Sequence, residues 1–565
     1  MGFYHQIIVV GSGLAGIRAA IEAKLNGLDV ALLSRVHPVR SHSIAAQGGI
    51  NSSLGNAPDG RDDNPEKHAF DTIKGSDYLA DQDAVEIMTK EAASIVYEME
   101  HWGTPFSRTE DGRIAQRPFG GAAFPRTCYA SDITGHALLH AMYEKSVKEY
   151  IKVYEEYLLL SIINKSDSCA GIIVLNIKTG DLEEIAADAV IMATGGYGRI
   201  YGNSTNAIIN TGSGMAAAYL TAGVPLKDME FVQFHPTTLY GTNILMTEGA
   251  RGEGGYLFNK AAERFMKNYT PKTMELAPRD IVARSIQTEI NEGRGFENSY
   301  VHLDLRHLGK KKILERLPGI RDICLHFAGL DPIKKQIPIQ PGQHYSMGGI
   351  DCNSKGETIL PGLYAAGECA CVSVHGANRL GGNSLLETIV FGKITGHFAS
   401  AYVKQKSKTD ANMESDLKKT TDKISKLESS TGKENPAEIR RELKTIMMDH
   451  AGIFREKEKL SDGLAKVKKL KERYKNISIM NKAKKYNLDL VRNLELEGKL
   501  ELGEIILKGA LQREESRGSH YRTDFKERDD KNWLKHTLAF NGGDGPQLKY
   551  KDVTITKFKP GARTY

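Results

Sequence analysis

The chain of 565 residues is 40% hydrophobic and 26% charged, a composition typical of globular proteins, and its length exceeds that of a single hydrophobic core. Its 76 basic and 70 acidic residues leave a formal charge of only +6, and no basic stripe interleaves with aromatic residues, so we expect no nucleic-acid partner. The six cysteines form no CxxC pair and no apolar run is long enough to cross a membrane, which argues against a disulfide framework, a metal or iron–sulfur site and a transmembrane segment.

The N-terminal residues predict a dinucleotide-binding unit. Residues 7–10 form a continuous apolar run, as a buried parallel strand requires, and a glycine-rich turn follows directly and opens into a helix-favouring stretch. In this context the first glycine permits the tight turn, the second admits a pyrophosphate close to the backbone, and the third lets the helix pack on the strand. The residues expected at the cofactor here are Gly11, Gly13, Leu14, Ala15 and Gly16.

A second predicted strand, residues 29–33, ends at Ser34, where the fingerprint for NAD expects an acidic residue on the ribose. A serine hydroxyl can still hydrogen-bond a ribose, but the departure leaves the identity of the dinucleotide open. The first strand begins within six residues of the N-terminus, so we expect no signal or transit peptide. We therefore expect the chain in the cytoplasm or at the cytoplasmic side of a membrane.

Three apolar runs that close on glycine, at residues 7–16, 189–196 and 362–368, predict one α/β cofactor domain that an insertion interrupts. From about residue 406 glycine becomes sparse and helical spacing begins, as in Ile439, Leu443, Ile446 and Met447. The last fifty or so residues are charged and contain isolated strand-like runs such as 553–555. The predicted parts are a cofactor domain (1–225 and 346–405), a capping and substrate domain (226–345), a helical domain (406–512) and an extended C-terminal tail packed on the surface (513–565).

Five glycine- or proline-rich loops each carry a histidine or an arginine. They lie at residues 231–237, 247–255, 277–280, 342–349 and 375–385. Each residue alone is more often structural than functional. Together they predict a pocket rich in cations and hydrogen-bond donors, which suits a small dicarboxylate because arginine pairs bidentately with carboxylates.

Over nearly its whole length the sequence resembles the flavoprotein subunits of succinate dehydrogenase and fumarate reductase. The resemblance rests on long motifs in a fixed order: the glycine turn, RSHSIAAQGGI (40–50), TGHALLHA (134–141), ATGGYGRIY (193–201), FVQFHPT (231–237), TEGARGEGG (247–255), PRD (278–280), HYSMGG (344–349), GLYAAGE (362–368), HGANRLGGNSL (375–385) and SRGSHYRTDFKERDDKNWLKHTL (516–538). It implies a Rossmann-like FAD-binding domain interrupted by an α+β capping domain and followed by a C-terminal helical domain and tail.

The resemblance also implies roles for individual residues. The histidine of RSH, His42, would carry FAD through a covalent bond. Dicarboxylate binding maps to His235, Thr247, His344 and Arg379, proton transfer to Arg279, and the relay that resupplies the proton to Glu248 and Arg251. Further residues expected at FAD are Ser34, Arg35, Ser41, Ser43, Gln47, Gly48, Gly49, Thr194, Gly195, Glu368, Asn383, Ser384, Leu385 and Ser213, the last standing where many members have aspartate.

The resemblance implies an enzyme of respiration and the tricarboxylic acid cycle that interconverts succinate and fumarate by hydride transfer to or from FAD. Its expected partners are an iron–sulfur subunit and a membrane anchor with quinone, which places it peripherally at the cytoplasmic side of the cell membrane. Three alternatives stay open: an L-aspartate oxidase-like enzyme with non-covalent FAD, a soluble fumarate reductase, and a flavin-bearing structural subunit without turnover. The physiological direction, the quinone type and the oligomeric state stay open as well.

Overall fold

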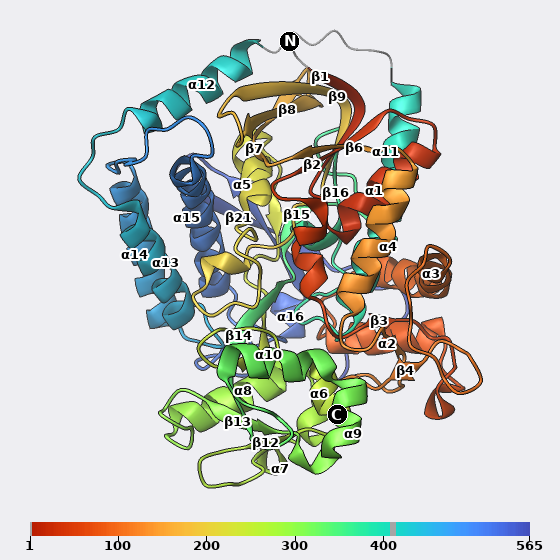
Figure 1. Cartoon of the computed structure of the whole chain (residues 1–565). Helices are drawn as coiled ribbons and strands as arrows, with labels where there is room; N and C mark the ends of the chain where they lie inside the picture. The colour runs from red at the N-terminus through yellow and green to blue at the C-terminus, as the bar shows by residue number, and fades with distance from the viewer. Residues whose placement is uncertain (1–2, 407–413, 565) are drawn as a thin grey trace.

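The computed structural model describes residues 3–406 and 414–564 (Figure 1). A seven-stranded sheet around β1 (Phe3–Val10) forms the cofactor-binding part. The apolar C-terminal end of β1 is buried, as expected for a parallel strand that is covered on both faces. β1 pairs in parallel with β2 (Val30–Ser34) and β9 (Leu182–Met192). The sheet continues through parallel β6 (Lys152–Glu155) on β2, antiparallel β8 (Ser168–Asn176) on β9 and β7 (Tyr157–Lys165) on β8, and parallel β16 (Leu363–Ala365) on β9.

Two helices of the cofactor domain pack tightly against each other. α1 (Leu14–Leu25) follows the glycine turn, and α11 (Asn383–Gln405) lies along it. A Cβ atom at Gly392 or Gly396 of α11 would lie 2.6 or 2.5 Å from a backbone oxygen of α1, so only glycine permits this approach. Around this pair lie α2 (Pro65–Gly75), α3 (Gln82–His101), α4 (Thr134–Lys148) and a small sheet of β3 (Ile50–Asn51), β4 (Gln116–Arg117) and β5 (Thr127–Cys128).

The inserted segment forms an α+β cap with a hydrophobic core of its own, drawn in green in Figure 1. Its antiparallel sheet has the order β11 (Val232–Leu239), β14 (Ile337–Ser346), β13 (Val301–Asp304), β12 (Tyr256–Phe258). The register between β11 and β14 shifts on either side of His235, and such irregularities turn side chains toward a site. The helices of the cap are α6 (Glu248–Gly252), α7 (Met266–Tyr269), α8 (Arg279–Asn291), α9 (Gly309–Arg316) and α10 (Pro318–Ala328).

The chain from residue 414 onward begins with helices, as the spacing of apolar residues predicts. Ile439, Leu443 and Met447 are buried on α13 (Pro436–His450), and Leu460 and Val467 are buried on α14 (Lys457–Tyr474). α15 (Leu488–Gln512) packs on both helices and on α5 (Ser213–Thr221) of the cofactor domain, and α12 (Glu414–Glu428) contacts β7 and β9.

The residues after α15 form more secondary structure, and bury more side chains near their start, than the predicted extended tail would. β20 (Lys535–Asn541) pairs with β10 (Leu226–Lys227) and β21 (Pro546–Asp552) in a five-stranded sheet that also holds β15 (Gly349–Asp351) and β17 (Ala370–Cys371). β19 (Tyr521–Arg522) pairs with β18 (Phe454–Arg455), and α16 (Asp530–Trp533) precedes β20. Residues 553–555 lie outside any strand.

Buried ion pairs explain this difference. Arg513 pairs with Glu230 and Glu515 at 2.8 and 3.0 Å, and Arg517 pairs with Glu515 at 2.8 Å. All four side chains are buried. Charged residues that compensate one another inside the protein have the same composition as a solvated surface, so the sequence pattern does not reveal this burial.

No helix within residues 3–406 and 414–564 combines the length and apolarity needed to cross a bilayer. The six cysteines are buried and free of disulfides.

A buried histidine joins β20 to the cofactor domain and predicts a pH-dependent stability. His536 lies 2.6 Å from Asp228 and 3.2 Å from Asp81. Burial alone would lower the pKa of His536, but the two carboxylates outweigh it and raise that pKa to about 9. The stabilisation is therefore fully present below the ordinary histidine pKa of about 6.5 and is lost as the pH rises through about 9.

We expect His536→Gln to lower the thermal midpoint by several degrees at pH 6, and the gap to wild type to shrink toward pH 9.5, about the range that these pKa values define. Calorimetry across this pH range measures the gap. His326→Gln, at an exposed position on α10, is the control and should leave the midpoint unchanged. A gap that does not vary with pH would contradict the charged state of His536.

Candidate active site

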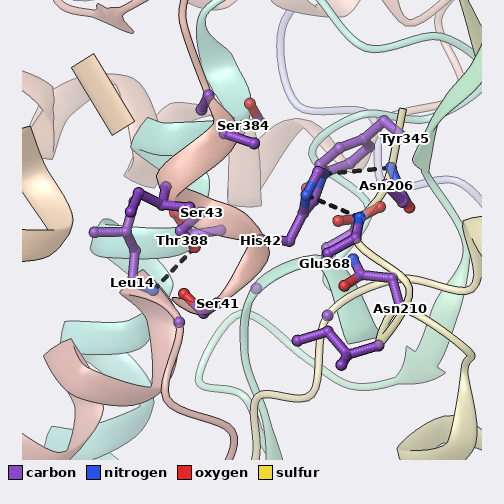
Figure 2. Close-up of a pocket in the computed structure, with 18 of the residues that line it drawn as sticks. Leu14, Ser41, His42, Ser43, Asn206, Asn210, Tyr345, Glu368, Ser384 and Thr388 are labelled. Carbon is purple, nitrogen blue, oxygen red and sulfur yellow. Dashed lines mark hydrogen bonds between the residues drawn. The ribbon is translucent and has the colours of Figure 1, made fainter. Parts of the chain in front are cut away.

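A single cavity of about 580 Å³ extends from the glycine turn after β1 to the cap (Figure 2). Its wall brings together residues from the first strand, the 40–50 segment, the loop after β9, the cap and the start of α11. Of the residues predicted from the sequence, the following line it: Gly11, Gly13, Leu14, Ala15, Ser34, Arg35, Ser41, His42, Ser43, Gln47, Gly48, Gly49, Thr194, Gly195, Ser213, Glu368, Ser384, Leu385, His235, Thr247, Glu248, Arg279, His344 and Arg379.

The glycine turn shapes one end of this cavity. A Cβ at Gly11, whose φ is +115°, would lie 2.1 Å from the backbone oxygen of Ala193, and one at Gly16 would lie 1.8 Å from that of Gly11. Gly13 caps the N-terminus of α1, and the Leu14 amide donates to Ser43 Oγ at 3.2 Å (Figure 2). The turn thus presents a helix N-terminus, which suits a phosphate group.

Three predicted residues lie off the wall. Gly16 supports the turn from behind through its packing on Gly11. Asn383 is fully buried, and its side chain bonds to Asn51, His68 and Thr72, so its role is to hold the start of α11. Arg251 lies behind Glu248.

Ser34 reaches the wall with its hydroxyl already engaged. It lies 2.5 Å from Ser12 Oγ and donates to the Val36 oxygen at 2.5 Å. The neighbouring Arg35 forms an ion pair with Glu495 of α15. Local hydrogen bonds therefore engage the Ser34 hydroxyl, and its contact with the cofactor stays a prediction.

His42 begins a short 3₁₀ helix, His42–Ala45, and its ring is held from across the cavity (Figure 2). The Ala207 amide donates to Nδ1 at 3.2 Å, and Asn206 Nδ2 lies 3.4 Å from Nε2. Burial, and secondarily Arg199, lowers the pKa of His42 to about 4, so the ring is neutral at physiological pH.

The sequence prediction missed this loop, although the asparagine-rich run at residues 203–210 was a signal for it. Asn206, Ala207 and Asn210 all line the cavity.

Several buried polar atoms on the wall lack a partner, which tests whether a polar cofactor fits. Ser41 Oγ, Gln47 Oε1 and Thr194 Oγ1 have no hydrogen-bond partner among the described residues. Such atoms are nearly always satisfied in native proteins. Together with the phosphate-type turn, they fit a dinucleotide with many polar groups.

At the far end of the cavity two histidines face each other. The rings of His235 and His344 lie 4.9 Å apart between centroids in an edge-on arrangement. Burial lowers the pKa of each well below 6.5, and neighbouring cations lower it further. His235 Nδ1 lies 3.2 Å from the Thr237 amide nitrogen and 3.1 Å from the Thr237 backbone oxygen, whereas its Nε2 has no hydrogen-bond partner among the described residues and is left for a ligand.

Arg279 stands at the start of α8, because Pro278 directly before it favours a helix start, and it is clamped by a carboxylate. Its Nε and Nη2 lie 2.7 and 2.6 Å from Glu248 Oε2. The other oxygen of Glu248 accepts the Gly120 amide at 2.9 Å and lies 3.8 Å from Arg251. Burial opposes ionisation of Glu248, but the two arginines outweigh it, so its pKa lies below the ordinary value.

Arg379 is a buried cation without a carboxylate partner. Its side chain is 2% exposed, and it forms no ion pair with any acidic residue in the described part of the chain. Burial, followed by the charge of Arg279, lowers the pKa of Arg379 to about 9. Since an isolated buried charge is costly, the arrangement favours an anionic ligand beside both arginines.

Comparison with known proteins gives two family matches. The FAD binding domain family matches residues 6–385, and the fumarate reductase flavoprotein C-terminal family matches residues 440–565. These matches and the cavity define an FAD-dependent oxidoreductase.

Two curated relatives and one solved structure are similar over nearly the whole chain. The succinate dehydrogenase flavoprotein subunit of Rickettsia bellii is 44% identical, covering 98% of this chain and 95% of its own length. The fumarate reductase flavoprotein subunit of Mycobacterium tuberculosis is 43% identical, covering 99% of both. A structure of E. coli quinol fumarate reductase has a TM-score of 0.95 at 41% identity, covering 100% of this chain and 99% of its own. The chain belongs to the family of succinate dehydrogenase and fumarate reductase flavoprotein subunits.

The glycine turn offers a substitution that should weaken cofactor binding without impairing folding. A methyl group at Gly13 would meet two side-chain oxygens, Ser43 Oγ at 3.1 Å and Ser41 Oγ at 3.8 Å, whereas one at Gly11 would clash with the backbone. We expect Gly13→Ala to keep the thermal midpoint of the apoprotein but to weaken FAD binding by about tenfold or more, because the methyl fills the approach to the helix N-terminus.

FAD titration of the apoprotein and calorimetry measure the two effects. Gly60→Ala, where a Cβ meets only ordinary contacts beyond 3.4 Å, is the matched control. Undiminished FAD affinity in Gly13→Ala would show that the phosphate does not bind at this turn.

Proposed function

We propose that this subunit interconverts succinate and fumarate with FAD bound covalently through His42, and exchanges electrons with an iron–sulfur subunit and, through a membrane anchor, with quinone. The observation that carries the proposal is the pair of buried guanidiniums, Arg279 and Arg379, of which one lacks a carboxylate partner in the described chain. They lie beside two neutral histidines on the wall of a cavity that also contains the FAD-type turn.

FAD, when bound, supplies hydride transfer chemistry. The chain's own groups position it. The N-terminus of α1 and the glycine turn would hold the phosphates, and the unpartnered atoms of Ser41, Gln47 and Thr194 would hydrogen-bond its polar groups.

The surroundings of His42 support covalent attachment at one particular nitrogen. Nδ1 uses its lone pair to accept the Ala207 amide, so in the neutral ring Nε2 carries the hydrogen that a bond to the flavin would replace. The lowered pKa of His42, about 4, keeps the ring neutral, so only the Nε2 proton would have to leave as that bond forms.

The dicarboxylate would be held by donors that the protein leaves free. Arg379 has an unpartnered Nε, and His235 has an unpartnered Nε2. Thr247 Oγ1 accepts the Gly249 amide at 3.1 Å as the cap of α6, which leaves its hydroxyl hydrogen for a ligand. His344 lies 2.8 Å from Thr205 Oγ1, which fixes its ring.

Arg279 would exchange a proton with the substrate carbon. Glu248 holds its guanidinium through two nitrogens, and Arg251 lies behind Glu248 away from the cavity. The order Arg279, Glu248, Arg251 thus forms a line of ionisable groups that leads from the cavity into the cap, as a proton relay requires.

The quinone-linked partners rest on the relatives. The E. coli structure is named quinol fumarate reductase and matches this chain along its length. By this likeness we place the subunit peripherally at the cytoplasmic side of the cell membrane.

Covalent attachment predicts a simple colour test. Acid-precipitated wild-type protein should stay yellow, and His42→Ser should give a colourless pellet while still binding FAD before precipitation, because only the bond and not the cavity is lost. Flavin absorbance of pellet and supernatant measures this. A colourless wild-type pellet would favour an L-aspartate oxidase-like enzyme instead.

The proton-transfer role predicts a loss of turnover that exceeds any loss of binding. We expect Arg279→Gln to lower kcat by about 100- to 10,000-fold in both directions, because proton transfer by a positioned group contributes on that order. Succinate-dependent dye reduction and fumarate reduction by the assembled complex measure it.

Arg321→Gln, which removes a partly exposed ion pair with Asp331 elsewhere in the cap, is the control. Near-normal turnover of Arg279→Gln with altered affinity alone would make Arg279 a carboxylate clamp. An absence of succinate oxidation and fumarate reduction by intact, flavin-loaded wild type would favour the structural-subunit alternative.

A further inference from the structure

Gln233 lies in β11, one residue before the register shift that turns His235 toward the cavity. Its side chain is fully buried and does not reach the cavity wall. It contacts Arg279 and Arg379, which do reach the wall, so it can influence the site without lining the cavity itself.

The amide of Gln233 makes four hydrogen bonds. Nε2 donates to Asn378 Oδ1 at 3.0 Å and to the Arg379 backbone oxygen at 2.8 Å. Oε1 accepts from Arg279 Nη1 at 3.2 Å and from Arg379 Nη2 at 3.0 Å. Two donors and two acceptor sites are the full capacity of an amide, so its orientation is fixed.

These bonds place one neutral oxygen between two buried cations. The guanidiniums repel each other, and the repulsion from Arg279 contributes to the lowered pKa of Arg379. Arg379 also lies 4.5 Å from the ring centre of Tyr345. The charged and titratable groups around the pair are Glu248 and Arg251 from α6, His235 from β11, His344 and Tyr345 from β14, Glu368 from the loop after β16, His375 from the loop before α11 and Glu387 from α11.

The bond from Gln233 also decides which hydrogens of Arg279 remain for a ligand. Arg279 uses Nε and one hydrogen of Nη2 on Glu248, and one hydrogen of Nη1 on Gln233. Among the contacts of the described residues, one N–H on each terminal nitrogen is left. Without Gln233 the guanidinium could rotate about the Glu248 pair.

We propose that Gln233 is a positioning residue that fixes the separation of the Arg279 and Arg379 guanidiniums and keeps the acceptor between them uncharged. The inference rests on the proposed function, in which Arg279 exchanges a proton. A carboxylate at the same place would favour the protonated form of both guanidiniums and would lose the two bonds to Asn378 and the Arg379 oxygen. The amide therefore suits proton transfer better than either a charged or an apolar side chain.

The test compares Gln233→Glu, Gln233→Leu and wild type in the assembled, flavin-loaded complex. Gln287→Glu makes the same isosteric change on α8, where Gln287 bonds only to Asn291 among the described residues, and serves as the control. Flavin content and thermal midpoint establish folding. The readouts are kcat and KM for succinate and fumarate, their pH profiles, and the equilibrium affinity for malonate, a dicarboxylate that does not react.

For Gln233→Glu we expect kcat to fall about tenfold or more at neutral pH, and the pH of half-maximal succinate oxidation to rise by about one unit, because the added charge favours protonated guanidiniums. For Gln233→Leu we expect kcat and malonate affinity both to fall about tenfold without that upward shift, because the arginines lose their fixed separation. The control should match wild type.

An unchanged pH profile in Gln233→Glu, or constants within about twofold of wild type in Gln233→Leu, would overturn the proposal. If the Glu variant does not assemble, the Leu constants alone decide. Failure of the proposed function would look different, since wild type itself would then show neither turnover nor malonate binding.

Discussion

The structure depends on buried positive charge. Arg279, Arg251 and Arg379 are all buried around one end of the cavity, and Glu248, the one carboxylate of the described residues within ion-pair distance of them, pairs with Arg279 and Arg251. Burying such charges is unfavourable unless something compensates them. The protein compensates in part with neutral acceptors, such as Gln233 and backbone oxygens, and leaves the remainder for an anionic ligand.

The fold explains how these charges can be assembled at all. The arginines come from the cap helices α6 and α8 and from the loop before α11, while the histidines come from β11 and β14. The cofactor end is built separately, from the turn after β1 and the loop after β9. A cap with its own hydrophobic core, placed over the Rossmann-like sheet, therefore brings a charged, buried site to one end of the dinucleotide cavity.

The sequence was sufficient for the parts that rest on local backbone requirements and on long motifs. Three features could be predicted, because each is a short pattern with a direct physical reason. They are the glycine turn, the helical spacing after about residue 406, and the loops that carry His235, Arg279 and Arg379. The hydrogen-bond partners of Asn383 and Ser34 could not be predicted, since they come from other segments of the chain.

Long-range contacts also hid other features. The Ala207 amide on His42 and the four bonds of Gln233 join segments far apart in the chain. The buried ion pairs of Arg513 and Arg517 anchor the start of the C-terminal segment in a way that its composition does not reveal. In each case the partner, and not the residue type, decides the role.

The central claim is that the cavity binds a dianion because Arg279 and Arg379 are incompletely neutralised. Its most direct test is equilibrium binding to the flavin-loaded complex of malonate, its monomethyl ester and malonamide, followed by the change in flavin absorbance. The account predicts that each lost charge weakens binding by about tenfold or more, so that the diamide does not compete. Equal affinity for the three compounds would contradict it.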